Sequence, residues 1–386
     1  MEHKTRIKGN VHYVGVNDRN KHRFEGMWPL PYGVSYNSYL IDDEMVALVD
    51  TVDICYFEVY LRKIKQVIGE RPINYLIINH MEPDHSGSIR LIKQHYPEII
   101  IVGNKQTFGM IEGFYGVTGE QYLVKEGDFL ALGHHKLRFY MTPMVHWPET
   151  MMTFDETDGV LFSGDGFGCF GTVDGGFLDT RINVDKYWGE MVRYYSNIVG
   201  KYGSPVQKAL QKLGGLPISA ICSTHGPVWT ENIAKVIGIY DRLSRYDADE
   251  GVVIAYGSMY GNTEQMAEAI AEELSAQGVK NIVMHNVTKS HPSYIIADIF
   301  RYKGLIIGSP TYSNQIFPEV EALLSKILLR EVKGRYLGYF GSFTWAGAAV
   351  KRLAEFAEKS KFELVGDPVE MKQAICLLYT SPSPRD

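Results

Sequence analysis

Short apolar runs of strand length alternate with amphipathic stretches through the first 230 residues of the chain. In the stretches between the runs, apolar residues recur every three or four positions, which is the spacing of a helix that packs on one face. The pattern predicts a mixed α/β fold for this part. The expected strands are residues 38–40, 45–50, 75–79, 99–102 and 159–163, and the expected helices are residues 57–68 and 89–95.

From residue 252 onward, strands and helices alternate more regularly, and the strands are apolar on both faces. Such an order is typical of an open, doubly wound parallel sheet with helices on both sides. The expected strands are residues 252–256, 282–287, 304–308 and 336–340, and the clearest helices are residues 264–275 and 319–329.

With 386 residues, the chain is too long for one hydrophobic core of ordinary size. A polar break at residues 247–251 follows an expected helix at residues 231–245, and we place a domain boundary there. A helix would normally close such a sheet after its fifth strand, but the end of the chain reads as translated adapter sequence on a truncated reading frame. The expected division is residues 1–248 and 249–375 for the domains and residues 376–386 for a non-native tail.

Charge and composition narrow the class of protein. The net charge of -6, without a long Lys/Arg block, argues against nucleic acid and anionic membranes as partners. No apolar run reaches the roughly 18 residues of a membrane span, and residues 1–10 lack the features of a secretory signal. Widely spaced cysteines argue against a disulfide framework and against a cysteine-ligated metal, so we expect a cytoplasmic protein. The cysteines are Cys55, Cys169, Cys222 and Cys376.

Potential metal ligands gather after the expected strand at residues 75–79. The segment His80-Met81-Glu82-Pro83-Asp84-His85 holds four of them in six residues. Any single histidine or carboxylate is usually an ordinary core or surface residue, but a set of seven at strand ends predicts a metal site. The other three groups, each after an apolar or strand-like run, are His146, Asp165 and His225.

Seven ligands exceed the four of a tetrahedral ion, so we expect two metals with one bridging carboxylate. Asp165 is the natural bridge, because it stands alone between Gly164 and Gly166, where the backbone approaches most freely. The loop resembles the metallo-β-lactamase signature H-x-H-x-D-H, with Glu82 at its second histidine. A carboxylate there favours iron over redox-inert zinc, and oxidoreduction over hydrolysis.

A second ligand signal follows the strand at residues 252–256. Residues 258–263 lie before an expected helix, whose N-terminus offers unpaired N–H groups and a favourable dipole to a phosphate. Neither the lysine of a nucleoside triphosphatase loop nor the G-x-G-x-x-G of a dinucleotide loop is present, so a phosphate monoester is preferred. The loop comprises Ser258, Met259, Tyr260, Gly261, Asn262 and Thr263.

This loop resembles the phosphate loop of flavodoxins, with Tyr260 where many of them have threonine. The resemblance implies FMN, with Tyr312 and Trp345 stacking on or shielding its ring. Two further loops follow the third and fourth strands at the carboxyl edge, where ligands bind in such sheets. They comprise Pro310, Thr311, Tyr312, Ser313 and Asn314, and Ser342, Phe343, Thr344, Trp345, Ala346 and Gly347.

The pattern H-x-E-x-D-H followed by HWPE, GD and HGP is similar to the flavodiiron proteins, over essentially the whole chain. The resemblance implies that Glu149 and Trp147 shape or orient the site, and that the histidine matching His85 turns away in some members. The implied ligands are His80, Glu82 and His146 for one iron, Asp84, His85 and His225 for the other, and Asp165 as the bridge.

The same resemblance implies an activity and its partners. FMN would take electrons from a separate donor, with a rubredoxin as the leading candidate, and pass them to a diiron site that reduces dioxygen to water, nitric oxide to nitrous oxide, or both. In the family, subunits pair head to tail so that one chain's flavin serves the other's iron pair, which implies a head-to-tail homodimer, or a dimer of such dimers, for this chain. Residues expected near the irons are His22, Phe24, Glu25 and Trp28.

Two other classes of function compete with this interpretation. The first is a zinc-type metallo-hydrolase fused to a flavodoxin module, which Glu82 disfavours. The second is an electron carrier with a vestigial metal loop, which the intact set of seven ligands disfavours. Metal analysis separates the three classes.

Overall fold

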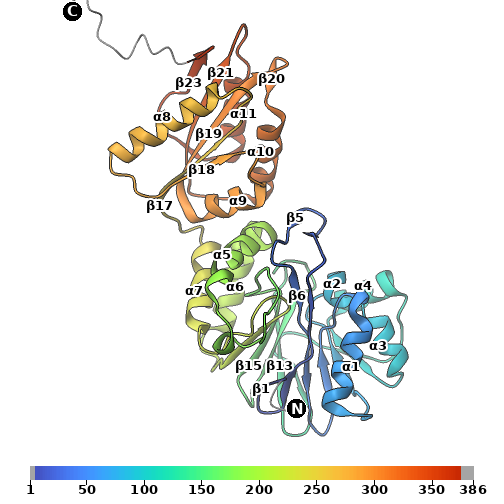
Figure 1. The fold of residues 1–386 in the computed structure, drawn as a ribbon. Helices are drawn as coiled ribbons and strands as arrows, with labels where there is room; N and C mark the ends of the chain where they lie inside the picture. Colours follow the sequence, from blue (N-terminus) through green and yellow to red (C-terminus); the bar gives the residue numbers. More distant parts are fainter. Residues whose placement is uncertain (1–4, 375–386) are drawn as a thin grey trace, which may run out of the picture. The chain divides into compact units, whose positions relative to one another are not determined.

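The computed structural model describes residues 5–374, and the chain divides into two compact units between Arg245 and Tyr246 (Figure 1). The expected non-native tail, residues 376–386, lies outside the described residues. Each unit has its own sheets and its own core, so each is described by itself.

The first unit contains two main sheets. One is antiparallel at its start and parallel from β8 onward, and the other is antiparallel except for its last pair. In spatial order, the first sheet is β1 (Arg6–Lys8), β2 (Val11–Tyr13), β7 (Tyr39–Ile41), β8 (Ala47–Val49), β9 (Tyr75–Ile77), β10 (Ile100–Gly103) and β11 (Gln121–Leu123). The second is β12 (Phe129–Ala131), β13 (Lys136–Met141), β14 (Met151–Asp155), β15 (Val160–Gly164) and β16 (Ala220–Ser223).

Helices cover both outer faces of this pair of sheets, which gives an αββα sandwich (Figure 1). Two short two-stranded ribbons complete the unit. The helices on one side are α1 (Phe57–Ile68), α3 (Ile89–His95) and α4 (Lys105–Tyr115), and those on the other are α5 (Asp185–Tyr194), α6 (Gly203–Leu213) and α7 (Ile233–Ser244). The ribbons are β3 (Val16–Asp18) with β6 (Val34–Tyr36), and β4 (Arg23–Phe24) with β5 (Trp28–Pro29).

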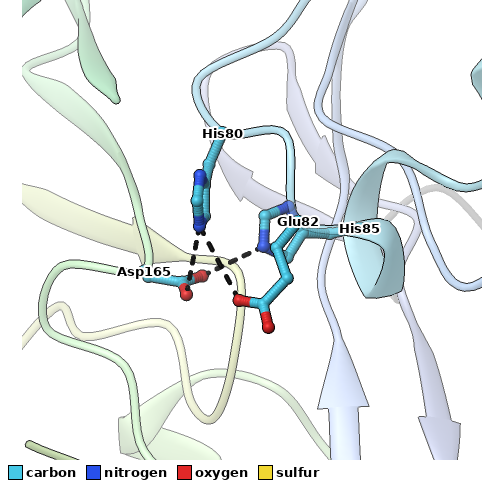
Figure 2. A group of neighbouring side chains, drawn as sticks. All are labelled: His80, Glu82, His85 and Asp165. Carbon is cyan, nitrogen blue, oxygen red and sulfur yellow. Dashed lines mark ion pairs between the residues drawn. The ribbon is translucent and has the colours of Figure 1, made fainter. Parts of the chain in front are cut away.

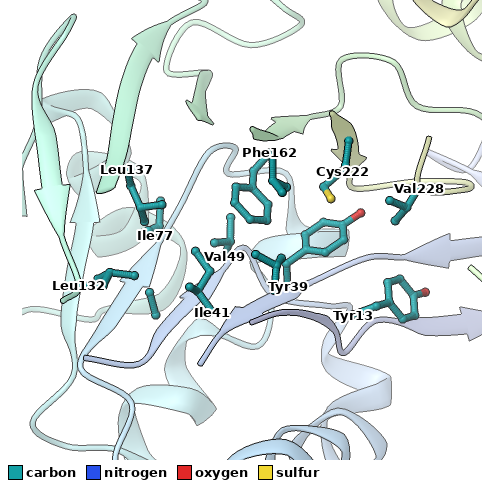
Figure 3. Packing of buried hydrophobic residues seen from close by; sticks show 14 of the residues in the cluster. Tyr13, Tyr39, Ile41, Val49, Ile77, Leu132, Leu137, Phe162, Cys222 and Val228 are labelled. Carbon is teal, nitrogen blue, oxygen red and sulfur yellow. The ribbon is translucent and has the colours of Figure 1, made fainter. Parts of the chain in front are cut away.

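The core of the first unit lies between the sheets (Figure 3). Alternate residues of a strand face the same side, so Tyr39 and Ile41 of β7 point together into this layer. Leu137 and Phe162 meet them from β13 and β15. The other face of β7 is also buried, which explains why its strand reads as a continuous apolar run.

The second unit is built around one parallel sheet. Its spatial order is that of a flavodoxin-like fold, with the second strand outside the first. The strands are β18 (Ile282–Asn286), β17 (Asp249–Tyr256), β19 (Tyr302–Tyr312), β21 (Tyr336–Phe343) and β22 (Glu363–Leu364), with β23 (Val369–Lys372) also on β21 and β20 (Gln315–Ile316) on β19. The helices are α8 (Asn262–Ala276), α9 (Pro292–Arg301), α10 (Pro318–Arg330) and α11 (Ala349–Ser360).

Three expected boundaries are wrong, each for a local physical reason. The segment after His80 is not all loop, because Pro83 occupies the first position of a helical turn, α2 (Pro83–Ser86). The polar residues from Asp249 onward belong to β17, where Asp249 pairs with Tyr302 at the start of β19. The strand expected to end at Gly308 continues to Tyr312, because its extension forms a hairpin with β20 and a ladder with β21.

Within residues 5–374, no helix combines the length and the apolar character that crossing a bilayer requires.

Candidate metal centre and flavin cavity

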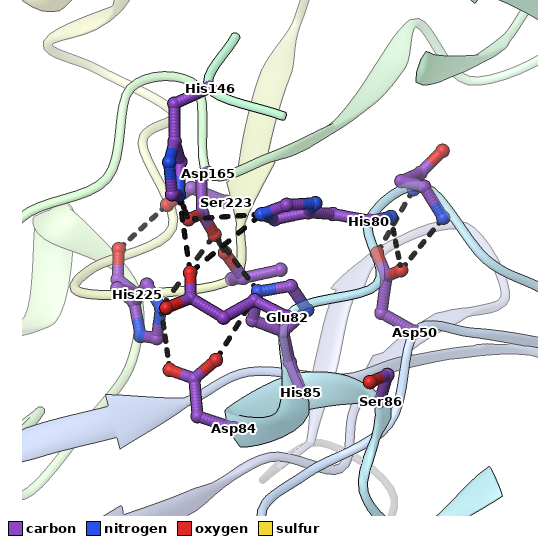
Figure 4. A network of polar contacts seen from close by, with 12 residues as sticks. Asp50, His80, Glu82, Asp84, His85, Ser86, His146, Asp165, Ser223 and His225 are labelled. Atoms are coloured by element: carbon purple, nitrogen blue, oxygen red, sulfur yellow. Dashed lines mark hydrogen bonds and ion pairs between the residues drawn. The ribbon is translucent and has the colours of Figure 1, made fainter. Parts of the chain in front are cut away.

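The metal-capable side chains of the first unit are carried by segments that follow strand ends in both sheets (Figure 4). His80 follows β9, and α2 carries Asp84 and His85. Asp165 comes directly after β15, and His225 follows β16. His146 lies between β13 and β14, and Glu82 stands at the residue just before α2. All seven expected side chains meet in one place.

One oxygen of Asp165 faces a first group of side chains, of which Figure 2 draws His80 and Glu82. Asp165 Oδ2 lies 3.0 Å from His146 Nε2 and 3.7 Å from His80 Nε2. Glu82 Oε2 completes the group, at 3.1 Å from His146 Nε2 and 3.7 Å from His80 Nε2. Two imidazole nitrogens and two carboxylate oxygens therefore converge on one point.

The other oxygen of Asp165 faces a second group with the same composition. Asp165 Oδ1 lies 3.2 Å from His85 Nε2 and 3.6 Å from His225 Nε2. Asp84 closes this group, with its oxygens 3.5 Å from His85 Nε2 and 3.3 Å from His225 Nε2. His85 thus turns toward the site in this chain. Each oxygen of Asp165 serves a separate pair of histidines.

These side chains are buried, yet several of their polar atoms have no hydrogen-bond partner among the described residues. They include Nε2 of His80, His85 and His225, and both carboxylate oxygens of Asp84. Buried polar atoms are nearly always satisfied in native proteins. Nitrogen and carboxylate donors that point at a common centre without protein partners fit bound cations.

The charges inside the cluster also favour cations. Burial disfavours the charged form of His85, but Asp84 and Asp165 outweigh it and raise its pKa to about 10. Burial would raise the pKa of Asp165, but His85 and His146 hold it well below its usual range. The bridging carboxylate therefore stays ionised although it is shut off from water.

Buried polar residues that the sequence analysis missed hold the site in place. Asn37 donates to the carbonyls of Ser223 and Gly226, at 2.9 and 2.8 Å, and so fixes the loop that carries His225. Asp50 accepts from the backbone N–H and the side chain of Asn79, just before His80. In the sequence, Asn37 stands just before the expected strand at residues 38–40. That local position does not reveal a hydrogen-bond partner far along the chain.

Aromatic rings close the side of the site that holds His225. The ring of Phe24, from the β4–β5 ribbon, lies 5.3 Å from the His225 ring and 6.2 Å from that of Tyr194. A cavity of about 500 Å³ leads to Glu82 and Asp84 from the surface, and both Phe24 and Glu25 line it. His22 is exposed and Trp28 is buried, and neither is among the described residues that line the cavity.

A third group of metal-capable atoms lies elsewhere in the first unit, at His135, Asp155 and Asp158. His135 Nδ1 lies 2.9 Å from Asp155 Oδ2, and the other oxygen of Asp155 accepts from the N–H of Thr157. These contacts already occupy His135 Nδ1 and both carboxylate oxygens of Asp155. We therefore treat the group as a structural histidine–carboxylate pair.

In the second unit, the three expected loops line one cavity of about 370 Å³, a size typical of a small-ligand site. Gly261 and Gly347 are outside the lining, and Gly347 packs so closely on Glu370 that a Cβ would lie 2.4 Å from its Oε1. Gln373 joins the lining, which the sequence analysis did not foresee. Of the two aromatic residues expected to shield a flavin, Trp345 is 83% exposed.

The start of α8 suits a phosphate. Its N-cap, Gly261, provides no side-chain cap, so the N–H groups of the first turn remain available to a ligand. The hydroxyls of Thr263 and Ser342 lie 2.9 Å apart and tie two of the loops together. Thr311 ties the third, because its hydroxyl accepts from the N–H groups of Ala348 and Ala349.

Comparison with known proteins agrees with this pair of sites. A model of the ODP family beta lactamase matches residues 34–226, and a flavodoxin model matches residues 254–375. The anaerobic nitric oxide reductase flavorubredoxin of Vibrio vulnificus is 32% identical over 363 residues, which are 92% of this chain and 73% of that protein. A flavodiiron protein from Giardia intestinalis has a similar structure, with a TM-score of 0.91 at 28% identity, covering 95% of this chain and 90% of that one.

The chain belongs to the flavodiiron protein family. Another solved relative, the rubredoxin oxygen:oxidoreductase of Desulfovibrio gigas, is 31% identical with a TM-score of 0.92, covering 97% of this chain and 94% of that one. The expected fold, a metallo-β-lactamase-like unit followed by a flavodoxin-like unit, is therefore confirmed. As a flavodiiron protein, the chain is an oxidoreductase.

Proposed function

We propose that this flavodiiron protein reduces dioxygen to water, nitric oxide to nitrous oxide, or both, at two irons supplied with electrons through FMN. The relatives support both substrates, because one is named a nitric oxide reductase and another an oxygen oxidoreductase. The observation that carries the proposal is the placement of Asp165, whose two oxygens face two separate groups of two histidines and one carboxylate.

Each group would hold one iron. The carboxylates of Glu82, Asp84 and Asp165 offer the hard anionic oxygens that stabilise ferric iron, while the imidazoles orient and tune the metals. The proposed ligands are His80, Glu82 and His146 for one iron and Asp84, His85 and His225 for the other, with Asp165 as the bridge.

The surrounding residues of the chain keep the site ordered and dry. Asn37 fixes the loop that carries His225, and Asp50 fixes the backbone before His80. Phe24 and Tyr194 cover the His225 side with aromatic rings, which limits water there. When bound, FMN supplies electrons singly or in pairs and the irons supply ferrous–ferric chemistry.

FMN would occupy the cavity of the second unit, with its phosphate at the start of α8. A rubredoxin is the proposed electron donor, in line with the name of the Desulfovibrio gigas relative. The proposed FMN-binding residues are Ser258, Met259, Tyr260, Gly261, Asn262, Thr263, Pro310, Thr311, Tyr312, Ser313, Asn314, Ser342, Phe343, Thr344, Trp345, Ala346 and Gly347.

We also propose a head-to-tail homodimer, or a dimer of such dimers, in which one chain's flavin faces the other chain's metal cavity. Ile54 and Phe114 line that cavity and are 55% and 52% exposed, so its mouth offers apolar surface to a partner. A cytoplasmic location is proposed because Cys55, Cys169 and Cys222 are free thiols. The proposed domains are residues 1–248 and 249–375.

Anaerobic reconstitution of the full chain with ferrous iron and FMN tests the function, followed by turnover with dioxygen and with nitric oxide in parallel. We expect consumption of at least one gas, and loss of that turnover in Asp165→Asn but not in the control Asp155→Asn, which alters a buried carboxylate outside the site. Two zinc ions per chain with hydrolytic activity and no gas consumption would instead establish the zinc-type hydrolase, which the named relatives do not favour.

A further inference from the structure

Glu149 lies directly behind one of the proposed ligands. Its side chain is fully buried, and its Oε1 lies 2.7 Å from His80 Nδ1 and 2.9 Å from the backbone nitrogen of Met81. A backbone N–H can only donate, so Oε1 acts as the acceptor in that contact. The same acceptor requires the hydrogen of the His80 ring to be on Nδ1, which leaves a lone pair on Nε2.

His80 Nε2 is the atom that faces the metal centre. It lies 3.7 Å from both Glu82 Oε2 and Asp165 Oδ2 and has no hydrogen-bond partner among the described residues. Glu149 therefore fixes the tautomer in which this nitrogen is free to bind a metal. A carboxylate in this position also makes the imidazole a stronger electron donor.

His225, a ligand proposed for the other iron, is held differently. Its Nδ1 lies 2.8 Å from the backbone carbonyl oxygen of Ser35, which is a neutral acceptor. Glu149 places a carboxylate in the corresponding position behind His80. The two histidines therefore receive unequal electron density from their supporting groups, because hydrogen bonds to ionised acceptors are shorter and stronger than neutral ones.

The second oxygen of Glu149 indicates that the carboxylate does more than tie two segments together. Oε2 is buried and has no hydrogen-bond partner among the described residues. A glutamine would satisfy the contacts to Met81 and His80 without a buried negative charge, which is costly unless a cation compensates it. A metal on His80 Nε2 provides that compensation through the ring.

We propose that Glu149 is a positioning residue that fixes the tautomer of His80 and, through its charge, lowers the reduction potential of the iron that His80 binds. This inference rests on the proposed function, because it requires iron in the site. Negative charge passed through His80 stabilises the ferric state relative to the ferrous state. Glu149 touches neither substrate nor metal in this role.

The test compares Glu149→Gln with native protein, both reconstituted with iron and FMN as full chains. A redox titration is monitored by Mössbauer spectroscopy, which gives the ferric fraction of the iron at each potential. The flavin does not interfere, because only iron contributes to the spectrum. We expect at least a tenfold shift of the ferric–ferrous equilibrium toward ferrous, equivalent to a midpoint about 59 mV higher for a one-electron step. A native midpoint at native iron content would overturn the proposal.

Asp155→Asn is the matched control. It also removes the charge of a buried carboxylate bonded to a histidine Nδ1 in the same unit, at His135, but away from the proposed ligands. Its iron midpoint should equal that of native protein. A control shift as large as that of Glu149→Gln would show that any buried charge of this unit produces the effect, and would overturn the specific role of Glu149.

Two further measurements test the proposal if Glu149→Gln loses its iron or fails to fold. If Glu149→Gln folds but retains little iron, competition with a chelator should show at least a tenfold loss of iron affinity, and native affinity would overturn the proposal. If that variant does not fold, Glu149→Asp withdraws the carboxylate from His80 and should raise the midpoint, whereas a native midpoint would overturn it. Native protein that binds no iron at all would instead refute the proposed function.

Discussion

The hydroxyl of Thr224 donates a hydrogen bond to Oδ1 of Asp165, within the buried site. Thr224 directly precedes His225, so one contact joins the loop after β16 to the residue after β15. The backbone repeats this link, because the N–H of Thr224 donates to the carbonyl of Gly164 at 2.9 Å. The proposed bridge is therefore oriented by the neighbour of a proposed ligand.

Replacing Thr224 by valine keeps the shape of the side chain and removes this donor. We expect the metal-free chain to lose about 1–3 kcal/mol of unfolding free energy, because a buried acceptor loses its partner. We also expect a lower iron content, since Asp165 loses one of the contacts that orient it. Denaturant unfolding and metal analysis of Thr224→Val check both effects, and Thr224→Ser, which keeps the hydroxyl, should resemble native protein.

Glu82→His is expected to shift the metal content toward zinc and to abolish gas turnover. Glu82 Oε2 faces both His146 and His80, and a neutral imidazole in its place makes that group softer and less anionic. Metal analysis of protein loaded from equal iron and zinc, followed by turnover, measures the change. Full activity with iron retained would show that this carboxylate does not select the metal.

Ser258→Asp is expected to weaken FMN binding at least tenfold, which is about 1.4 kcal/mol, and to leave riboflavin binding unchanged. The new carboxylate would lie beside the N-terminus of α8, where it repels a phosphate and competes for the same N–H groups. Ser258 already accepts from the N–H of Gly261 at 3.1 Å, and aspartate can replace that contact. Fluorescence titrations with both flavins would show the difference, and equal losses for the two would contradict a phosphate at this position.

The pair His135 and Asp155 predicts a pH dependence of stability in the first unit. Burial opposes the charge on His135, but Asp155 outweighs it and raises the pKa of the imidazole. A raised folded pKa means that the stabilisation is complete below the unfolded pKa, about 6.5, and is lost as the pH rises through the folded pKa. Denaturant unfolding from pH 6 upward should show native protein losing this stability, while His135→Gln shows a flatter profile.

The sequence singled out seven metal-capable residues, because each of them comes after a strand-like run and their spacing is dense, and the structure brings their side chains together. The residues that hold them were not predictable in the same way. Asn37 acts on a partner 186 positions away in the chain, at Ser223. The family resemblance implied that Glu149 orients the site, but it did not identify the partner, His80, which lies 69 positions away. Such contacts depend on how the two sheets pack, and no local pattern records them.

In the second unit, the residues of the flavin cavity were likewise predictable only where they depend on local sequence. The start of α8 was predictable, since a strand, a polar loop and a helix follow one another in the sequence. The extension of β19 to Tyr312 was missed, because it depends on pairing with β20 and β21. Gln373 reaches the cavity only because β23 lies beside β21, a pairing between segments about 30 residues apart.

Anomalous diffraction at the iron edge, from crystals of the protein reconstituted with iron and FMN, would locate the metals themselves. We expect two iron peaks in the first unit, one among His80, Glu82 and His146 and the other among Asp84, His85 and His225, with Asp165 between them. A single peak, or peaks that appear only at the zinc edge, would contradict this expectation.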